Sequence, residues 1–410
     1  MNRHPPTRRS QRGVGALAVT MLLLFTMSFI ALFANRSLLF EQRSSANQYR
    51  STRAFEMAEA GVEWATAMLN DPRAIDARCV TAGGGASFRD KYLPHDTNFR
   101  FTPVTNVRPA CRASGNALAC ACPQPGDAVD LGASNDASFS VTLAEVAGDP
   151  GSVQLTAWGC TGQGTQCVPG SAHGAADATA RASIILKLKP LLRVIPAAAV
   201  TAGGAVDIGG PVAISNLDIA SNGALIHAGL GITTASSVTL ATLPGSPPLN
   251  ALIGNDSALD SGTLFNAFFG MTPDRFMTAG PVHRISADSP TARALALKAA
   301  YEQGHSAFHV DDELLFDAAA VGSAARPILV VSAHPLGCSG PCEIHGLVYT
   351  DAAARDASDL ANVSIHGAVV TRGQHNQAGG GSIAYEAATL QTLRHRTGML
   401  VRVPGSWRDF

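Results

Sequence analysis

The residues best suited to chemistry lie in the C-terminal third of the chain, where histidines and carboxylates gather. The segment HVDDELLFD, residues 309–317, holds four carboxylates and a histidine. Carboxylate oxygens bind Ca²⁺, but this segment lacks the glycine and the ligand spacing of an EF-hand loop. Leu314, Leu315 and Phe316 also predict core residues there. We therefore interpret the segment as an exposed acidic turn, with a looser calcium site as the alternative.

A short repeat contains two further histidines. The sequence IHGLVYT at 344–350 returns as IHGAVVT at 365–371. If the two copies are successive coils of a β-solenoid, isoleucine lies over isoleucine and His345 lies over His366. Two stacked imidazoles could bind a metal ion, but the repeat offers no evident third ligand. We interpret the pair as a polar face and predict no metal site.

The motifs of common enzymes are missing from the sequence. Glycine-rich stretches such as TAGGAV and AGGGS lack the lysine and threonine of a phosphate loop, and no G-x-S-x-G elbow occurs. No nucleophile stands beside a base. We therefore predict no catalytic residue, no cofactor and no enzyme activity, and the net charge of -1 argues against a nucleic-acid partner.

The eight cysteines favour an oxidising compartment outside the cytosol. Cys160 and Cys167 bracket TGQGTQ, and Cys338 and Cys342 bracket SGP, so each pair is expected to close a small loop. Two of the remaining four are too close in sequence to bond each other easily. We expect these two to reach the other two, in an order left open, with a zinc site as the alternative; the four are Cys79, Cys111, Cys120 and Cys122.

The apolar run from Val14 to Ala34 explains how the chain reaches that compartment. A helix of this length spans about 32 Å, which matches a hydrocarbon core about 30 Å thick. Bulky residues stand where a secretory cleavage site needs small ones, so we expect the run to stay in the membrane. Four arginines precede it and no acidic residue does, which predicts a cytoplasmic N-terminus and export of the rest.

The helix is expected to continue beyond the membrane to about residue 70. An apolar stripe along its last turns needs a packing partner, and the stripe is Phe55, Ala58, Val62, Ala65 and Leu69. Alternating apolar residues then predict antiparallel strands around Phe99 and Phe101, 139–143, 153–157 and 184–188. The stripe on this sheet would complete a first core, with a boundary near residue 190.

Short apolar pairs separated by glycines follow from residue 200 and again from 327 to 385. Pairs such as Val206 with Ile208 and Leu217 with Ile219 suit short strands that turn corners, as in a β-solenoid. Between the two blocks, Ser289 and Pro290 begin a helix that Gly304 ends, and LFNAFF at 264–269 predicts a shorter one with buried aromatics.

The start of the chain resembles the N-terminus of type IV pilins, in which a basic leader ends in glycine and an apolar helix follows at once. The resemblance implies that a prepilin peptidase cuts after Gly13, and that Val14 becomes the first residue and is N-methylated. The sequence AFEMAEAGVEWA at 54–65 is similar to the F-x-x-A-E-A-G/A pattern of PilX-type pilus assembly proteins, and the end LVRVPGSWRDF looks like the close of larger members. Most pilins carry a glutamate five places beyond the cut, where this chain has Ala18. In lacking that glutamate, the chain is similar to the minor pilins assigned to the filament tip.

The resemblance and the patterns together predict an α+β protein. We expect a long N-terminal transmembrane, pilin-like helix packed on an antiparallel β-sheet, then a β-rich, solenoid-like C-terminal domain. The parts are a leader (1–13), the helix (14–70, membrane part 14–34), a β-rich head with cysteines (71–190), and the solenoid-like domain (191–410) with a helical insert at about 259–304.

The function implied is that of a minor pilin, first in the inner membrane and later at the cell surface in a pilus. It would prime assembly at or near the tip and support adhesion or twitching motility. Expected partners are prepilin peptidase, other minor pilins and the major pilin through the helix, and a large tip adhesin. The alternative is a membrane-anchored periplasmic β-solenoid that binds or cleaves glycans and is unrelated to pili.

Overall fold

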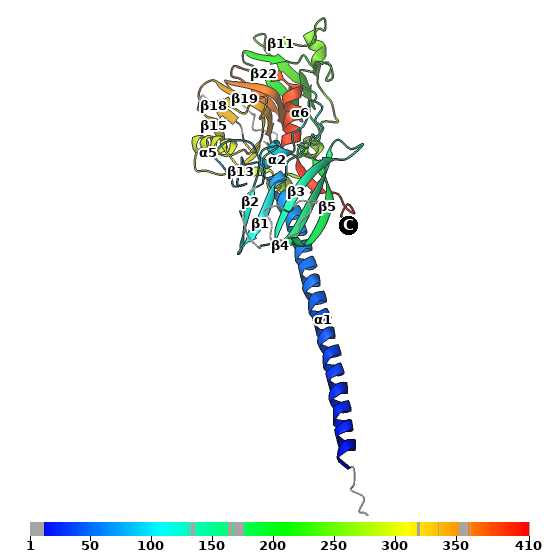
Figure 1. The fold of residues 1–410 in the computed structure, drawn as a ribbon. Coiled ribbons are helices and arrows are strands. Elements are labelled where there is room, and N and C mark those ends of the chain that lie inside the picture. The colour runs from blue at the N-terminus through cyan, green and yellow to red at the C-terminus, as the bar shows by residue number, and fades with distance from the viewer. Residues whose placement is uncertain are drawn as a thin grey trace, which may run out of the picture.

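The protein consists of a long helical stalk, an antiparallel sheet seated on the upper end of the stalk, and a parallel β-region beyond it (Figure 1). The computed structural model describes residues 12–129, 131–132, 136–162, 167, 176–317, 320–334, 336–351, 360 and 362–409. Residues 1–11, most of the expected leader, lie outside the described residues. The α+β class predicted from the sequence is confirmed.

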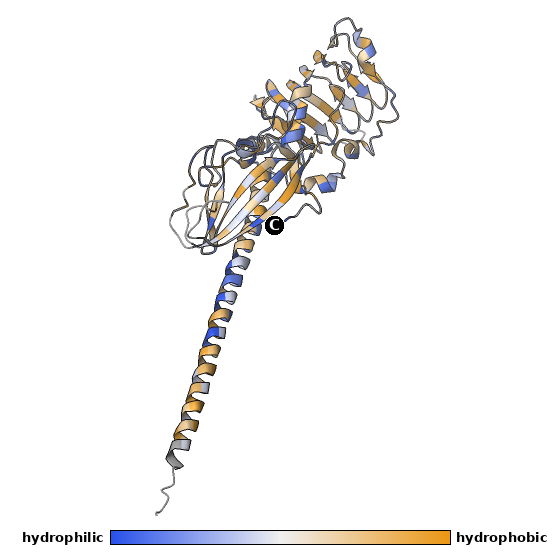
Figure 2. Ribbon diagram, turned by 45° about the vertical axis from the view of Figure 1, so that its right-hand side comes forward, coloured by the Kyte–Doolittle hydropathy of each residue, from blue (hydrophilic) through white to orange (hydrophobic). Residues whose placement is uncertain are grey.

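The stalk is the single helix α1, Arg12–Asn70, of 59 residues. Every described side chain from residue 15 to 53 is exposed. Figure 2 shows apolar residues concentrated in the half of the stalk far from the head and polar residues nearer to it. Among the described residues, this helix is the one long and apolar enough to cross a membrane, with a mean hydropathy of 2.4 over its most apolar window.

The last turns of α1 pack on the sheet. The predicted stripe is confirmed at Ala58, Val62, Ala65 and Leu69, all of which are buried. Phe55 is only half-buried, because the buried position one residue earlier belongs to Ala54. Small residues on this face let the helix approach the sheet closely, which a phenylalanine ring would prevent.

The sheet is antiparallel and has the strand order β2-β1-β3-β4-β5-β23. Its strands are β1 Ala110–Ser114, β2 Ala117–Ala121, β3 Ser138–Glu145, β4 Ser152–Gly162, β5 Ala176–Lys189 and β23 Met399–Arg402. Three of the four predicted strands are confirmed in β3, β4 and β5. The one at Phe99 and Phe101 is wrong: Phe99 has a left-handed φ of 58°, and Phe101 makes only an isolated bridge to His95, although its ring is buried.

The remaining β-strands form a parallel solenoid. Three coils stack strand on strand, with register pairs along each edge. The coils are β6 Val200–Ala202, β7 Val206–Ile208 and β8 Val212–Ser215; β9 Ile226–Ala228, β10 Ile232–Thr234 and β11 Thr239–Ala241; and β20 Val363–Thr371, β21 His375–Gln377 and β22 Gly381–Tyr385. The β-solenoid expected from the short apolar pairs is thus present.

The coils do not stack in chain order. The coil at 200–215 lies between the coil at 226–241 and the coil at 363–385, so the chain enters the solenoid in its middle. The chain first adds coils toward one end of the solenoid, where it forms η1 Pro248–Ala251 and β12 Leu252–Ile253. It then crosses to the other end of the solenoid. From there it returns through β13 Val282–Ile285, β14 Ala307–Val310, β15 Leu314–Phe316, β16 Ala320–Val321, β17 Ile328–Ser332, β18 Leu336–Cys338 and β19 Cys342–Thr350 to β20.

A ladder of apolar side chains runs through this order and forms the solenoid core. Register pairs link each residue to the next, and the ladder is Phe308, Val330, Val348, Val369, Val200 and Ile226. All six are buried. Residues far apart in sequence therefore share one core, and the middle coil is held on both sides. Leu217 and Ile219, expected in a strand, instead lie exposed in the turn after β8.

The predicted helices are confirmed. Helix α5, Pro290–Glu302, begins at Ser289, whose hydroxyl accepts a hydrogen bond from the Ala292 amide. Helix α3, Leu264–Phe269, is followed by α4, Pro273–Met277. The rings of Phe265 and Phe269 in α3 pack on Tyr349 of β19, and Phe276 of α4 packs on the same two rings. Helix α6, Ala387–Arg396, covers the same outer face of the solenoid.

The chain then leaves the solenoid and returns to the first sheet. Strand β23 pairs with β5, which adds residues 399–402 to the sheet near the N-terminal part of the chain. The division of the chain at residue 190 stays a prediction.

Candidate functional site

The distal half of α1 is the most distinctive surface of the molecule. Large apolar side chains surround it on all sides, each more than half exposed, including Leu17, Met21, Phe25, Phe29 and Phe33. Water solvates such a surface poorly, and burying one of these side chains is worth about 1.5–3 kcal/mol. A helix that is apolar all round requires an apolar environment, such as lipid or other helices.

Polar side chains within this half bond to their own helix. The hydroxyls of Thr20 and Thr26 donate to the carbonyl oxygens of Leu17 and Leu23 at 3.0 and 2.9 Å, and Ser28 donates to Leu24 at 2.8 Å. Their hydrogen-bonding capacity is thus met without water, as a membrane or a helix bundle requires.

The C-terminal end of α1, residues 54–70, is packed tightly on the sheet. Gly159 of β4 lies against α1 so closely that a Cβ atom there would overlap the backbone of Ala54 and Ala58. Gly61 faces the ring of Phe139 and the methyl group of Ala157, at 3.0 Å from an added Cβ atom. Two glycines, one on each side, therefore make the helix and sheet one tightly packed unit.

The end of α1 is tied to the last strand. The Asn70 side-chain amide donates to the Leu400 carbonyl oxygen at 2.9 Å, and the Leu400 amide donates back to Asn70 Oδ1 at 2.8 Å. The side chain of Arg402, also in β23, makes an ion pair with Glu63 of α1. The end of α1 and the segment that leaves the solenoid are thus joined directly.

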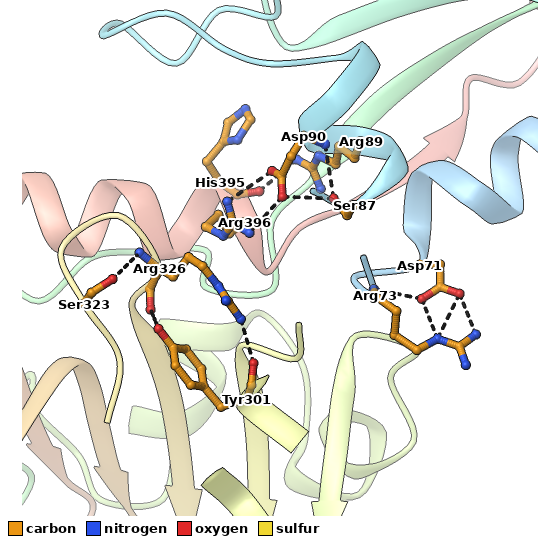
Figure 3. A network of polar contacts seen from close by, with 10 residues as sticks. All are labelled: Asp71, Arg73, Ser87, Arg89, Asp90, Tyr301, Ser323, Arg326, His395 and Arg396. Atoms are coloured by element: carbon orange, nitrogen blue, oxygen red, sulfur yellow. Dashed lines mark hydrogen bonds and ion pairs between the residues drawn. The ribbon is translucent and has the colours of Figure 1, made fainter. Parts of the chain in front are cut away.

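A half-buried arginine, Arg89, joins the head to the solenoid (Figure 3). Arg89 lies in α2, Phe88–Tyr92, and donates to the carbonyl oxygens of Gly398 and His395 at 2.8 and 2.9 Å. Burial lowers the pKa of Arg89 to about 10, so it stays charged at neutral pH. It neutralises the carbonyl dipoles at the C-terminal end of α6.

An ion pair between Arg396 and Asp90 lies beside Arg89. Arg396 donates from both terminal nitrogens to the two oxygens of Asp90, each at 3.1 Å. Burial raises the pKa of Asp90, but the charge and hydrogen bonds of Arg396 outweigh burial and the pKa is lowered. Ser87 caps α2 and also donates to Asp90 at 3.0 Å. The junction is therefore fixed by bidentate bonds, which define an orientation.

The cysteines are all paired in disulfides. The four bonds are Cys79–Cys122, Cys111–Cys120, Cys160–Cys167 and Cys338–Cys342. The two loops expected from spacing are therefore formed, and the order left open among the other four cysteines is resolved. Disulfides take the place of the zinc site considered for those four.

The acidic segment 309–317 is neutralised by cations from neighbouring elements. Asp311 pairs with Arg284 at 2.7 Å, and Asp312 pairs with Arg293 at 3.3 Å. These pairs engage two of the four carboxylates of the segment, and the looser calcium site stays an untested alternative. The interpretation of an acidic turn beside buried Leu314 fits this arrangement.

The histidine ladder expected from the repeat is present. His345 pairs with His366 in the register of β19 and β20, and the rings stack with centroids 4.6 Å apart and planes at 14°. The repeat needs its glycines, because Gly346 and Gly367 have left-handed φ angles and an added Cβ atom on either would overlap a carbonyl oxygen of the neighbouring coil. The sequence offered no third ligand, but the structure brings one, Glu343, to both rings.

Gly13 and Val14 lie in the first turn of α1. Cleavage between them stays a prediction. Ala18 follows on the exposed apolar surface.

Comparison with protein families gives one match to this helix. Residues 15–63 match the family model described as PilX N-terminal. The matched residues run from the exposed apolar half of α1 into the half seated on the sheet. The PilX-type N-terminal region expected from the sequence is therefore confirmed.

Comparison with other proteins adds little. No match is found among curated proteins. Among solved structures, the competence-associated pilin ComZ from Thermus thermophilus is similar at 10% identity, over 88% of this chain and 97% of that chain, with a TM-score of 0.26. A similarity this low carries no argument about the fold or the activity.

Proposed function

We propose that the protein is a minor pilin of a type IV pilus. The observation that carries the proposal is the division of one helix, α1, into a fully exposed apolar N-terminal half and a C-terminal end, residues 54–70, that is packed on a folded head. Such a helix can present its apolar half to lipid and later to other helices without any change in the head. The PilX N-terminal match, residues 15–63, covers the apolar half and runs into the packed end.

The mechanism is physical. The apolar half is first stored in the inner membrane, with the arginine-rich leader in the cytoplasm and the head outside. After prepilin peptidase removes the leader, the helix leaves the bilayer and packs against the helices of other minor pilins and the major pilin. Both environments bury the same apolar surface, so the transfer needs only modest work.

We place the subunit at or near the filament tip. In pilins that form the shaft, a glutamate is thought to contact the amino terminus of the neighbouring subunit, and this chain has Ala18 instead. A subunit without that carboxylate fits a position where the contact is not needed. There it would prime assembly, and its solenoid, at the end opposite the stalk in Figure 1, is available to a tip adhesin or to a surface.

The decisive experiment is N-terminal sequencing of the protein extracted from membranes. We expect the mature chain to begin at Val14 and to co-purify with sheared pili. A Gly13→Val variant should keep Met1 and fail to enter pili, whereas Gly15→Ala, at a position with open space around it, serves as the matched control and should be processed normally. Deletion of the gene should reduce surface pili.

An intact Met1 in the wild-type protein, with normal piliation after deletion, would reject the proposal. That result would favour the alternative, a membrane-anchored solenoid that binds glycans. The tip position has its own test. If the proposal holds, Ala18→Glu increases the amount of the subunit found along the shaft by immunogold labelling, and an unchanged position contradicts the proposed role of Ala18.

A further inference from the structure

The stacked histidines on the solenoid belong to a cluster of possible metal ligands, which has no part in the proposed pilus function. Glu343 stands two residues before His345 on β19, so the two side chains point to the same face of the sheet. His366 lies on the adjacent β20, directly across from His345. One carboxylate and two imidazoles therefore meet on two neighbouring coils.

The distances within this group suit a single metal ion. Glu343 Oε1 lies 3.0 Å from His345 Nε2 and 3.3 Å from His366 Nε2. Three ligand atoms at 2.0–2.1 Å from a tetrahedral zinc ion are about 3.3 Å apart. Both distances from Glu343 thus have nearly the spacing of ligands around zinc, and all three ligand atoms lie within 4.8 Å of one another.

A second carboxylate orients one of the rings. Glu386, at the start of α6, lies with Oε1 2.8 Å from His366 Nδ1. Its other oxygen accepts a hydrogen bond from the Thr389 hydroxyl at 2.7 Å. A metal-binding histidine usually donates its other N–H to a carboxylate in this way, which leaves the Nε2 lone pair free for the metal.

The chemistry of the group selects the cation. Imidazole nitrogens suit zinc and other late transition metals better than calcium or magnesium, which prefer oxygen ligands. Two histidines and one glutamate are also the protein ligands of zinc sites that keep a coordination position open. The side chains of Glu343, His345 and His366 are 48%, 19% and 32% exposed, so an ion can enter from solvent.

The backbone around the group is rigid. Cys338–Cys342 closes the turn directly before Glu343, and the glycines after each histidine fit only without a Cβ atom. Rigid support of this kind keeps ligands close to the required geometry.

We propose that Glu343, His345 and His366 bind one Zn²⁺ ion, with Glu386 as the residue that positions His366 and a fourth coordination position open to water or to a side chain of another protein. This site would clamp two coils of the solenoid at its surface. It does not depend on the role of α1 in a pilus.

The test is a Zn²⁺ titration by calorimetry of the full-length chain in detergent, treated with EDTA and carrying a tag without histidines. We expect one equivalent of Zn²⁺ to bind with a measurable heat. Glu343→Gln, His345→Gln and His366→Gln should each abolish binding or lower the affinity by at least about 100-fold. Glu386→Gln is expected to weaken binding about 10–100-fold, the range for residues that orient a ligand. Co²⁺ in place of Zn²⁺ should give the visible absorption of a tetrahedral site.

A second histidine pair in this chain supplies the matched control. His283 and His305 also stack, with centroids 4.4 Å apart, but in the described part of the chain no carboxylate forms an ion pair with either. His283→Gln should leave zinc affinity unchanged. The melting temperature of each variant in EDTA checks folding, and Zn²⁺ should raise it for the wild type and not for Glu343→Gln.

Absence of a binding heat and of a thermal shift in the wild type would overturn the proposal. It would also be overturned if Glu343→Gln kept the wild-type affinity, or if His283→Gln lost as much affinity as His366→Gln. In those cases the ladder is an ion-paired polar face, held by Glu343 and Glu386 without a metal.

Discussion

Gly159 of β4 lies directly against the backbone of Ala58 in α1, with no room for even one more carbon atom. The contact explains why small residues recur in the AFEMAEAG segment. Ala54, Ala58 and Gly61 together form a flat helix face that approaches the sheet within backbone contact. The segment that identifies the PilX-type region is thus the segment on which the head is seated.

Replacement of Gly159 with alanine should separate α1 from β4. The added methyl group overlaps backbone atoms, which cannot rotate away, so we expect a loss of about 1–3 kcal/mol or more in the free energy of unfolding. Gly61→Ala should cost less, because its methyl group meets side chains at 3.0 Å. Gly83→Ala, in open space, is the matched control. Thermal melts should rank the three variants in this order, and equal melting temperatures would contradict the close contact.

The disulfides should differ in their contribution to stability. Cys79–Cys122 spans 43 residues of sequence separation and Cys338–Cys342 spans only 4. If cross-links act mainly by restricting the unfolded chain, the first contributes about 4 kcal/mol and the second about 2 kcal/mol. Paired Cys→Ala variants, compared by chemical unfolding under oxidising conditions, should show the larger loss for Cys79 and Cys122. The reverse order would indicate that native packing, rather than loop closure, dominates.

Local patterns in the sequence predicted much of this fold. Periodicity of 3.6 and of 2 marked the seated part of α1 and the strands β3 to β5, and the IHG repeat predicted that His345 lies over His366. These local patterns do not indicate which strands pair when they are far apart in the sequence. Nothing near Val200 indicates that Val369 is its neighbour, and nothing near Met399 indicates a return to β5.

The third possible ligand of the histidine ladder was missed for a related reason. Glu343 stands outside the repeated IHG triplet, so comparison of the two copies drew no attention to it. Alternation along β19 places Glu343 and His345 on one face, and that signal was available once the strand was known. Glu386 comes from the turn before α6 and could be found only from the structure.

Loss of Arg89 should weaken the junction between head and solenoid. Arg89→Met keeps the length of the side chain but removes the donors to the carbonyl oxygens of His395 and Gly398. The His395 carbonyl oxygen still accepts from the Gly398 amide, but the Gly398 carbonyl oxygen loses the Arg89 donor. A buried acceptor that loses its donor costs about 1–3 kcal/mol, so we expect a loss of about that size in stability and faster proteolysis near residue 398. Arg78→Met, at an exposed arginine whose ion pair measures 3.9 Å, is the matched control and should change stability little. Similar behaviour of the two variants would show that Arg89 does not hold the junction.

Acid should destabilise the junction through His395. Burial, with the charge of Arg89 next, lowers the pKa of His395 to about 3 from an ordinary value of 6.5. Above pH 6.5 the imidazole is neutral in the folded and unfolded chains, and the shift has no effect. Between pH 6.5 and about 3, His395 binds a proton in the unfolded chain but stays neutral in the folded chain. The free energy of unfolding therefore falls as the pH falls.

The measurement is the melting temperature as a function of pH from about 7.5 to 5. His395→Leu keeps an apolar side chain among the rings of His95 and Phe101 and removes the titrating group, so its melting temperature should decline less steeply than that of the wild type. Part of the decline should remain, because burial also lowers the pKa of His305 and His309. His334→Leu, at a side chain that is 47% exposed, is the matched control and should follow the wild-type curve. If His395→Leu declines as steeply as the wild type, the acid sensitivity does not come from His395.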